Sequence, residues 1–300
     1  MHSSGILRWF VFSNLLYGLA LLALQLQSVI LLHLPFANVW FYLACFNGTL
    51  LFYTHAYLFS TASETQDERI QWYLKHKPSI WISQTFLTLI LIISLWKLMP
   101  YLPIFTIGIY WPIIIFPLLA LLYYGGIQPG GSAFNLRKFG WLKPIIIALV
   151  WAGIGTLLPE WWSKAVNDSP YLPSTASLLL FLQQLLYLLV LSILFDVKDF
   201  AADHNLHLKT WVIRVGQDQL FKRVIIPLIL LGNLAELGNG LLVGYPPFNA
   251  LLNTIPWVLL IFAARTIQQQ RSVVHYLWVL DGLIPLKATI SILLHLIFHK

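Results

Sequence analysis

The chain has 300 residues, of which 59% are hydrophobic, 15% aromatic and only 10% charged, with a formal net charge of +7. A soluble domain carries about 25% charged residues, so this composition excludes an ordinary soluble protein. Apolar runs of about 20 residues recur along the chain, the length that crosses a bilayer as an α-helix. In such a protein the basic excess indicates loops that face an anionic leaflet, and no nucleic-acid partner.

We predict an all-α fold, a polytopic bundle of nine transmembrane helices that forms a single domain over residues 1–300. The first span follows a short N-terminal segment and is long enough to remain a helix, so we expect no cleaved leader. Cys45 is the only cysteine, which excludes an intrachain disulfide. The predicted spans cover residues 10–32, 37–59, 79–97, 101–123, 141–158, 174–195, 222–243, 248–264 and 277–298.

Lysine and arginine are distributed unevenly between the two sides of this arrangement. Fourteen of the eighteen fall in the N-terminus or in the loops after the second, fourth, sixth and eighth spans, while the other side receives Lys97, Lys164 and Lys300. The positive-inside rule then makes the N-terminus cytoplasmic and the C-terminus external. We expect an integral protein of a bacterial inner (plasma) membrane.

Two loops carry further expectations. Residues 60–78, on the cytoplasmic side, have mixed charges, and we expect them to be partly helical. Residues 159–173, on the outer side, contain Trp161 and Trp162, which are suited to an aromatic belt at the membrane interface.

Three aspartates follow the sixth span directly. Asp196, Asp199 and Asp203 are spaced i, i+3 and i+7, which places their carboxylates on one face of a helix. Like charges on one face repel, so a divalent cation or a cationic patch would stabilise them. The alternative is a solvated acidic cap at the end of a helix.

The run Asp196-x-x-Asp199-x-x-x-Asp203-x-x-x-His207-x-Lys209-Thr210 resembles the second aspartate-rich motif of the UbiA-type intramembrane prenyltransferases. That motif lies at the cytoplasmic end of the sixth of nine helices, as here. The resemblance implies a central cavity in which the three aspartates act as catalytic residues and hold Mg²⁺. It also implies that an isoprenyl group is transferred from an isoprenyl diphosphate to an acceptor.

The same resemblance implies residues for the substrate. Lys209 and Thr210 belong to the motif, and Lys143, at the start of the fifth span, resembles a basic residue that the family uses near the diphosphate. Mg²⁺ with oxygen ligands, helped by cations, would stabilise the charge that develops on the leaving diphosphate.

The family's first aspartate motif should lie at the end of the second span, but residues 47–57 contain no carboxylate. Asn47, Tyr53 and His55 stand there instead. They could line a polar substrate pocket, or they could form hydrogen bonds between helices, as polar side chains in membrane bundles do.

Three charged residues, Glu236, Asp281 and Lys287, lie well inside predicted spans, away from the first and last residues of each span. Charges at this depth usually face the bundle interior. Asp281 lies at the same depth as the aspartate motif and could line the substrate cavity, whereas Glu236 and Lys287 could pair across helices.

Three functions remain open. The first is a prenyltransferase that works through one aspartate motif and Mg²⁺. The second is a non-catalytic relative that binds a lipid or prenyl chain, which the missing first motif favours. The third is a small-molecule transporter with Asp281, Glu236 and Lys287 as its polar path, although paired broken helices are not predicted. The expected partners are membrane lipids and an isoprenyl diphosphate or other lipid-like molecule; the sequence does not indicate the donor chain length, the acceptor or the oligomeric state.

Overall fold

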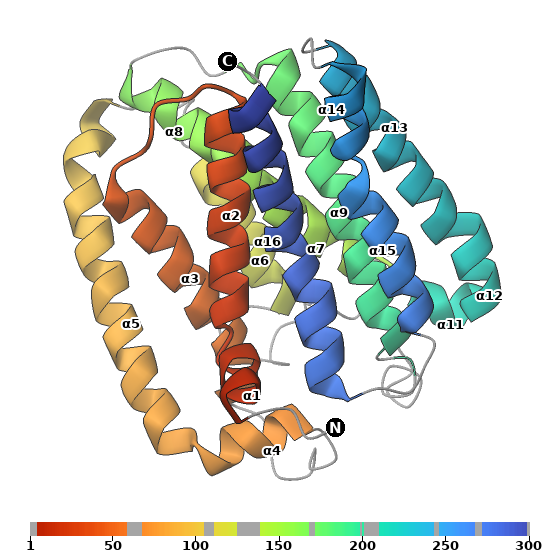
Figure 1. The fold of residues 1–300 in the computed structure, drawn as a ribbon. Helices are drawn as coiled ribbons and strands as arrows, with labels where there is room; N and C mark the ends of the chain where they lie inside the picture. The colour runs from red at the N-terminus through yellow and green to blue at the C-terminus, as the bar shows by residue number, and fades with distance from the viewer. Residues whose placement is uncertain are drawn as a thin grey trace.

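The structure is a computed structural model that describes residues 5–58, 68–104, 111–124, 139–167, 172–198, 200, 210–242, 246–267 and 272–298. These residues form helices joined by short connections, in one bundle (Figure 1). The chain forms helices because its apolar runs can satisfy their own backbone groups in lipid only as helices or closed barrels.

Among the described residues up to 157 there are nine helical segments, several of which continue one another. They are α1 (Gly5–Phe12), α2 (Leu15–Leu31), α3 (Val39–Leu58), α4 (Glu68–Lys75), α5 (Lys77–Leu98), the 3₁₀ segment η2 (Met99–Ile104), α6 (Trp111–Tyr124), α7 (Lys143–Ala152) and the π-helical turn η5 (Gly153–Leu157).

The residues described from 158 onward form nine more. They are α8 (Leu158–Val166), α9 (Thr175–Lys198), α11 (Trp211–Val215), α12 (Gln217–Leu220), the π-helical turn η6 (Phe221–Ile225), α13 (Ile226–Leu242), α14 (Pro247–Leu252), α15 (Ile255–Thr266) and α16 (Val273–Phe298).

Each of the nine predicted spans overlaps a helix of the described chain. Six helical segments are long and apolar enough to cross a membrane, and α1 with α2, bent by 62° at their junction, would make a seventh. The apolar part of α6 is shorter, at Ile114–Tyr123. The all-helical membrane fold is thus found, while the number of nine spans stays a prediction.

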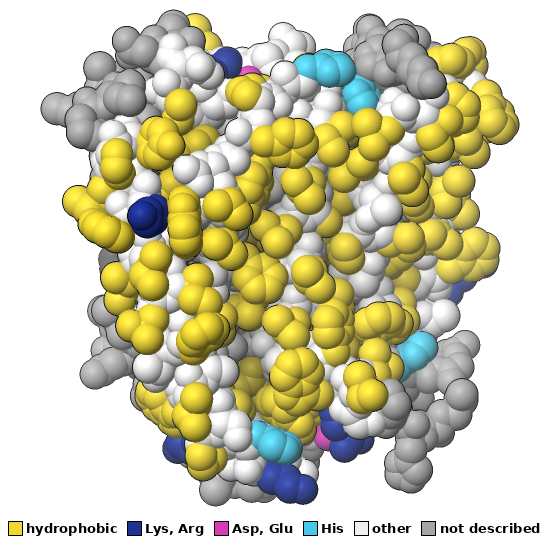
Figure 2. Space-filling model, turned by 60° about the vertical axis from the view of Figure 1, so that its left-hand side comes forward, with side chains coloured by type: hydrophobic (Ala, Val, Ile, Leu, Met, Phe, Trp, Pro, Cys, Tyr) yellow, Lys and Arg dark blue, Asp and Glu magenta, His cyan; other side chains and the backbone are white. Residues whose placement is uncertain are grey.

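The long helix α9 runs through the interior and packs against α7, α13 and α16, while α2 packs against α16 and α3. The main hydrophobic core joins these helices, with Leu191, Ile193 and Leu194 of α9 almost completely buried. Helix α5 instead exposes a row of large apolar side chains, including Ile82 and Phe86. Figure 2 shows this exposed surface as mostly hydrophobic, with charged and histidine side chains gathered mainly toward its two ends, as expected for a lipid-facing surface.

Two loop expectations had different outcomes. The prediction of helix within residues 60–78 is confirmed by α4. The prediction that the tryptophan pair lies in an interfacial belt was wrong, because Trp161 and Trp162 are buried in a core cluster with Phe41 and Leu98. The helix of the fifth span continues through η5 into α8, and this continuation carries both indole rings into the bundle.

Candidate functional site

The first residue of the aspartate motif lies inside the bundle. Asp196, in the last turn of α9, has no exposed side-chain surface, and its Oδ1 lies 2.7 Å from Nζ of Lys143. Helix α7 begins at Lys143 with Pro144 in its first turn. Proline suits this position because the backbone N–H that it lacks would have no partner within the helix there, and because its φ is already helical. The structure therefore brings together two residues that the sequence selected separately, and Asp196 is not a solvated cap.

The other motif residues give less information. Asp199, Asp203 and Lys209 lie outside the described residues. Thr210 is buried, and its extended backbone immediately precedes α11. Its hydroxyl has no hydrogen-bond partner among the described residues. Thr210 is thus placed in the interior, at the same end of the bundle as Asp196.

A buried arginine lies at this end of the bundle as well. Arg69 of α4 is only 4% exposed, and its guanidinium carbon lies 4.3 Å from the centre of the Tyr57 ring. The guanidinium donates a hydrogen bond to Oδ1 of Asn14, and its carbon also lies 5.9 Å from the centre of the Tyr17 ring. The interaction with Tyr57 is a cation–π contact, which is worth more when both groups are desolvated. Arg69 is therefore a fixed interior cation, held by α2, α3 and α4.

The break between α1 and α2 makes this arrangement possible. Asn14, at the break, adopts φ 64°, a left-handed conformation that asparagine tolerates better than most residues. Its Nδ2 donates to Oγ1 of Thr54 and to the hydroxyl of Tyr73, each at 2.9 Å. The Tyr73 hydroxyl in turn donates to the carbonyl of Phe12 at 2.8 Å. Burial raises the pKa of Tyr73, so this hydroxyl keeps the proton that it donates.

A second carboxylate lies in the same part of the bundle. Asp281 of α16 is 3% exposed and interacts electrostatically with Arg69 and Lys198. Lys198 belongs to the last turn of α9, two residues after Asp196. The end of α9 thus connects the Lys143–Asp196 pair on one side with the Asp281–Arg69 group on the other.

Aromatic side chains lie between these polar groups and the core. Tyr53 of α3 stacks on Tyr17 at a centroid distance of 4.4 Å, and its hydroxyl accepts a 2.7 Å hydrogen bond from Nε1 of Trp151. The Trp151 ring also meets Tyr17 edge-on at 6.2 Å. These three rings come from α2, α3 and α7, and together they form an aromatic wall beside Arg69.

The other two polar residues of α3 lie differently. Asn47 is buried, and its Nδ2 donates to the carbonyl of Leu43 at 2.7 Å, one turn earlier in the same helix. His55 is partly buried and has interactions of its own. Of the three α3 residues predicted to bind substrate, Tyr53 is the one that contacts other helices of the site through the interactions described above.

The described residues do not form a metal site by themselves. They contain no group of three or more histidine, cysteine, aspartate or glutamate side chains that could hold a metal ion. Asp196 contributes one carboxylate, and a lysine ammonium already lies against it. A Mg²⁺ site would therefore need Asp199 and Asp203.

The remaining intramembrane charges lie in a separate cluster. Nζ of Lys287 lies 3.4 Å from Oε2 of Glu236, and both side chains are almost fully buried, which confirms the predicted pairing across helices. Nε1 of Trp257 also lies 3.4 Å from Oε2 of Glu236, and the Lys287 ammonium lies 5.7 Å from the Tyr187 ring. This cluster joins α9, α13, α15 and α16.

Arg69, Tyr17 and Trp151 were not selected from the sequence. Arg69 looked like one of several charges in a polar loop, and the aromatic residues resembled the other apolar positions of their spans. Arg69 could have been selected from its position shortly after the end of α3, which contains no carboxylate. In the structure, its burial distinguishes it from the other charged residues of that loop.

Comparison with known proteins gives a fold relationship. No protein-family model matches the chain, and no curated protein sequence matches it. A solved structure from a study of digeranylgeranylglyceryl phosphate synthase in membranes is similar, with a TM-score of 0.57, 15% identity and coverage of 97% of this chain and 96% of that chain. At this identity the match concerns the fold alone. The chain therefore shares its fold with that synthase structure, and its long apolar helices make it an integral membrane protein.

Proposed function

We propose that this protein is a UbiA-like membrane prenyltransferase that transfers an isoprenyl group from a prenyl diphosphate to an acceptor. The observation that carries the proposal is the fold similarity, which extends over nearly the whole of both chains. The reaction would take place at the end of the bundle where Asp196, Arg69 and Asp281 lie. We also propose that this end faces the cytoplasm, because most of the lysine and arginine residues fall on its side of the predicted spans.

The cations at this end fit a diphosphate. Arg69, Lys143 and Lys198 come from three different helices, and a departing diphosphate needs such donors as its negative charge develops. An arginine can bind two phosphate oxygens at once, whereas lysine acts as a point charge. Arg69 stands beside the end of α3, where the family has its first aspartate motif. We therefore assign to Arg69 part of the diphosphate binding.

The aromatic wall fits the other half of the donor. When the diphosphate leaves, positive charge develops on the allylic carbon of the prenyl chain. The faces of Tyr17, Tyr53 and Trp151 can stabilise a cation by cation–π interaction, worth about 2 kcal/mol or more where water is excluded. The hydrogen bond between Trp151 and Tyr53 holds the two rings in place.

Magnesium remains part of the proposal through Asp196, Asp199 and Asp203. Bound Mg²⁺ would supply positive charge to the diphosphate oxygens. Because Lys143 already pairs with Asp196, the metal part of the proposal depends on the two aspartates outside the described residues. Thr210 and Lys209 would flank that group.

A second candidate is a non-catalytic UbiA-like protein that binds a lipid or prenyl chain. The observation that favours it is the buried Lys143–Asp196 pair, which neutralises the first motif carboxylate, together with the absence of carboxylates in residues 47–57. The transporter alternative gains nothing from the structure, because Glu236 and Lys287 are bonded to each other in the interior.

Binding of geranylgeranyl diphosphate to the purified protein in nanodiscs tests the proposal. We expect binding that strengthens with Mg²⁺ and weakens in Asp196→Ala, Asp199→Ala and Arg69→Gln. Glu68→Gln is the matched control, because Glu68 forms a half-exposed ion pair with Arg8 at the same end of the bundle. Binding without release of diphosphate, across a panel of acceptors, would favour the non-catalytic candidate. Binding that all three substitutions leave unchanged would refute the site.

A further inference from the structure

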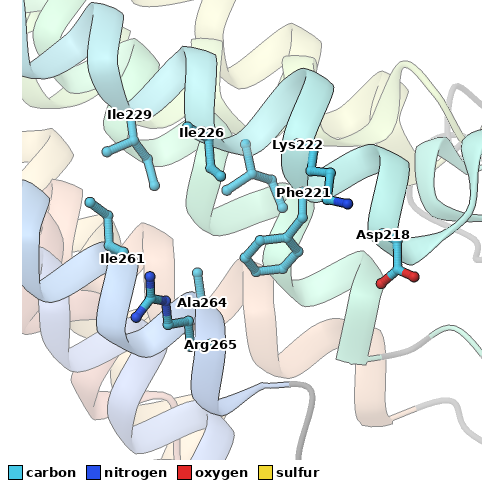
Figure 3. A pocket seen from close by; sticks show the side chains of 9 residues that line it. Asp218, Phe221, Lys222, Ile226, Ile229, Ile261, Ala264 and Arg265 are labelled. Atoms are coloured by element: carbon cyan, nitrogen blue, oxygen red, sulfur yellow. The ribbon is translucent and has the colours of Figure 1, made fainter.

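A cavity of about 270 Å³ lies between the η6–α13 helix and α15 (Figure 3). Lys222, Ile226 and Ile229 line it from one side, and Ile261 and Arg265 line it from the other. The Phe221 ring projects from η6 into the space between the two helices. None of these residues belongs to the proposed prenyltransferase site.

The lining changes from charged to apolar along the helix axis. Lys222 and Arg265 are exposed, whereas Ile229, two turns further along the same helix as Lys222, is almost fully buried. At 1.5 Å per residue, Lys222 and Ile229 are about 10 Å apart along the axis. The cavity therefore has a basic mouth and a hydrocarbon interior, the two parts that an amphipathic anion needs.

The cavity is accessible from the bilayer. Ile226, which lines it, is 44% exposed, and the neighbouring Leu230 and Phe262 are 54% and 58% exposed. The π-helical turn η6 carries Phe221 and Ile225, and both residues line the cavity. Single π-turns within helices are often found at functional sites. A lipid chain could enter sideways from the membrane.

The positive charge at the mouth of the cavity favours an anionic ligand. Lys222 and Arg265 supply two positive charges, and Asp218, also at the cavity, supplies one negative charge. The net positive mouth lies on the side that the positive-inside rule makes cytoplasmic, where anionic lipids are concentrated. Basic pockets between membrane helices on that side are typical sites for anionic lipid head groups.

We propose that this cavity binds an anionic membrane phospholipid, with its phosphate between Lys222 and Arg265 and one acyl chain along Ile226, Ile229 and Ile261. Asp218 can accept a hydrogen bond from a hydroxyl group of the head group. The bound lipid would join α13 to α15. The proposal does not depend on prenyl transfer, because no residue that lines the cavity belongs to the proposed prenyltransferase site.

Native mass spectrometry of the delipidated protein in detergent, titrated with phosphatidylglycerol or phosphatidylcholine, measures the site. We expect phosphatidylglycerol to bind more tightly. One cation at a membrane surface contributes about fivefold in lipid affinity, so Lys222→Gln with Arg265→Gln should weaken phosphatidylglycerol binding by about 25-fold. Arg223→Gln is the control, because Arg223 is an exposed cation next to Lys222 that does not line the cavity.

A second pair of variants tests the apolar part. Ile226→Trp should fill the cavity and weaken the binding of both phosphatidylglycerol and phosphatidylcholine. Leu230→Trp, on the exposed surface of the same helix, should weaken the binding of neither lipid. Both positions are exposed, so neither substitution disturbs the core. Equal binding of the two lipids, or an Arg223→Gln effect as large as that of the double variant, would overturn the proposal. The proposal would also be overturned, and a different ligand identified, if inorganic phosphate displaced the lipid. The same holds if geranylgeranyl diphosphate displaced it at concentrations below those at which phosphatidylglycerol binds.

Discussion

Nζ of Lys143 lies 2.7 Å from Oδ1 of Asp196, and this ion pair joins the first turn of α7 to the last turn of α9 inside the bundle. The pair has a structural role whether or not Asp196 also binds a metal. Removing one partner leaves the other charge buried without compensation, which is usually worse than removing both. This asymmetry allows the two roles to be separated.

The first prediction concerns this pair. Asp196→Asn and Lys143→Met should each destabilise the protein by about 3 kcal/mol, and the double variant should recover most of that loss. Denaturation in detergent, followed by near-ultraviolet circular dichroism, measures the stabilities. If either member of the pair also acts on the substrate, the recovered double variant still fails to bind geranylgeranyl diphosphate. Restored binding in the double variant would instead limit the pair to a structural role.

The second prediction concerns Arg69. Arg69→Lys keeps the charge but loses the planar fork and the stacking on Tyr57, so we expect it to weaken geranylgeranyl diphosphate binding by about 2 kcal/mol. Arg69→Gln should weaken binding further. Isothermal titration in nanodiscs gives the affinities, with Arg8→Gln as the control because Arg8 lies in the half-exposed pair with Glu68. An Arg69→Lys affinity equal to that of the native protein would exclude Arg69 from diphosphate binding.

The third prediction separates the Glu236–Lys287 pair from the proposed site. Glu236→Gln should destabilise the protein by about 3 kcal/mol, and Glu236→Leu with Lys287→Met should be close to native stability. Neither variant should change the affinity for geranylgeranyl diphosphate when the protein is folded. Loss of that affinity in the stable double variant would contradict the separation of the two clusters.

The fourth prediction uses two glycines of α13. A Cβ at Gly232 would lie 2.0 Å from the buried Trp257 ring, whereas a Cβ at Gly238 would meet nothing within 4 Å. Gly232→Ala should therefore destabilise by about 1–3 kcal/mol through overpacking. Gly238→Ala should be neutral or stabilise by up to about 1 kcal/mol, because alanine favours a helix. Equal thermal unfolding temperatures for the two variants would contradict this packing.

The helical membrane fold was predictable for two reasons. An apolar run of about 20 residues matches the thickness of the hydrocarbon core, and in lipid such a run can satisfy its backbone hydrogen bonds only as a helix or in a closed barrel. Every predicted span overlaps a helix, and Glu236 and Lys287 paired as expected because buried charges in lipid need partners. The π-turns η5 and η6 were not predicted, since no residue pattern marks them. The tryptophan pair was misplaced because an indole at the end of a span suits either an interface or a core.

The sequence by itself determined the membrane class, the helix positions and the aspartate motif, because these follow from local hydrophobicity and spacing. Only the tertiary structure decided which polar residues meet. Asp196 pairs with Lys143, which lies 53 residues earlier in the chain, and Arg69 contacts Asn14, Tyr17 and Tyr57, which come from other segments. Such contacts depend on how whole helices bend and cross, as at the Asn14 break. That geometry is set by packing between distant segments, which no local pattern records.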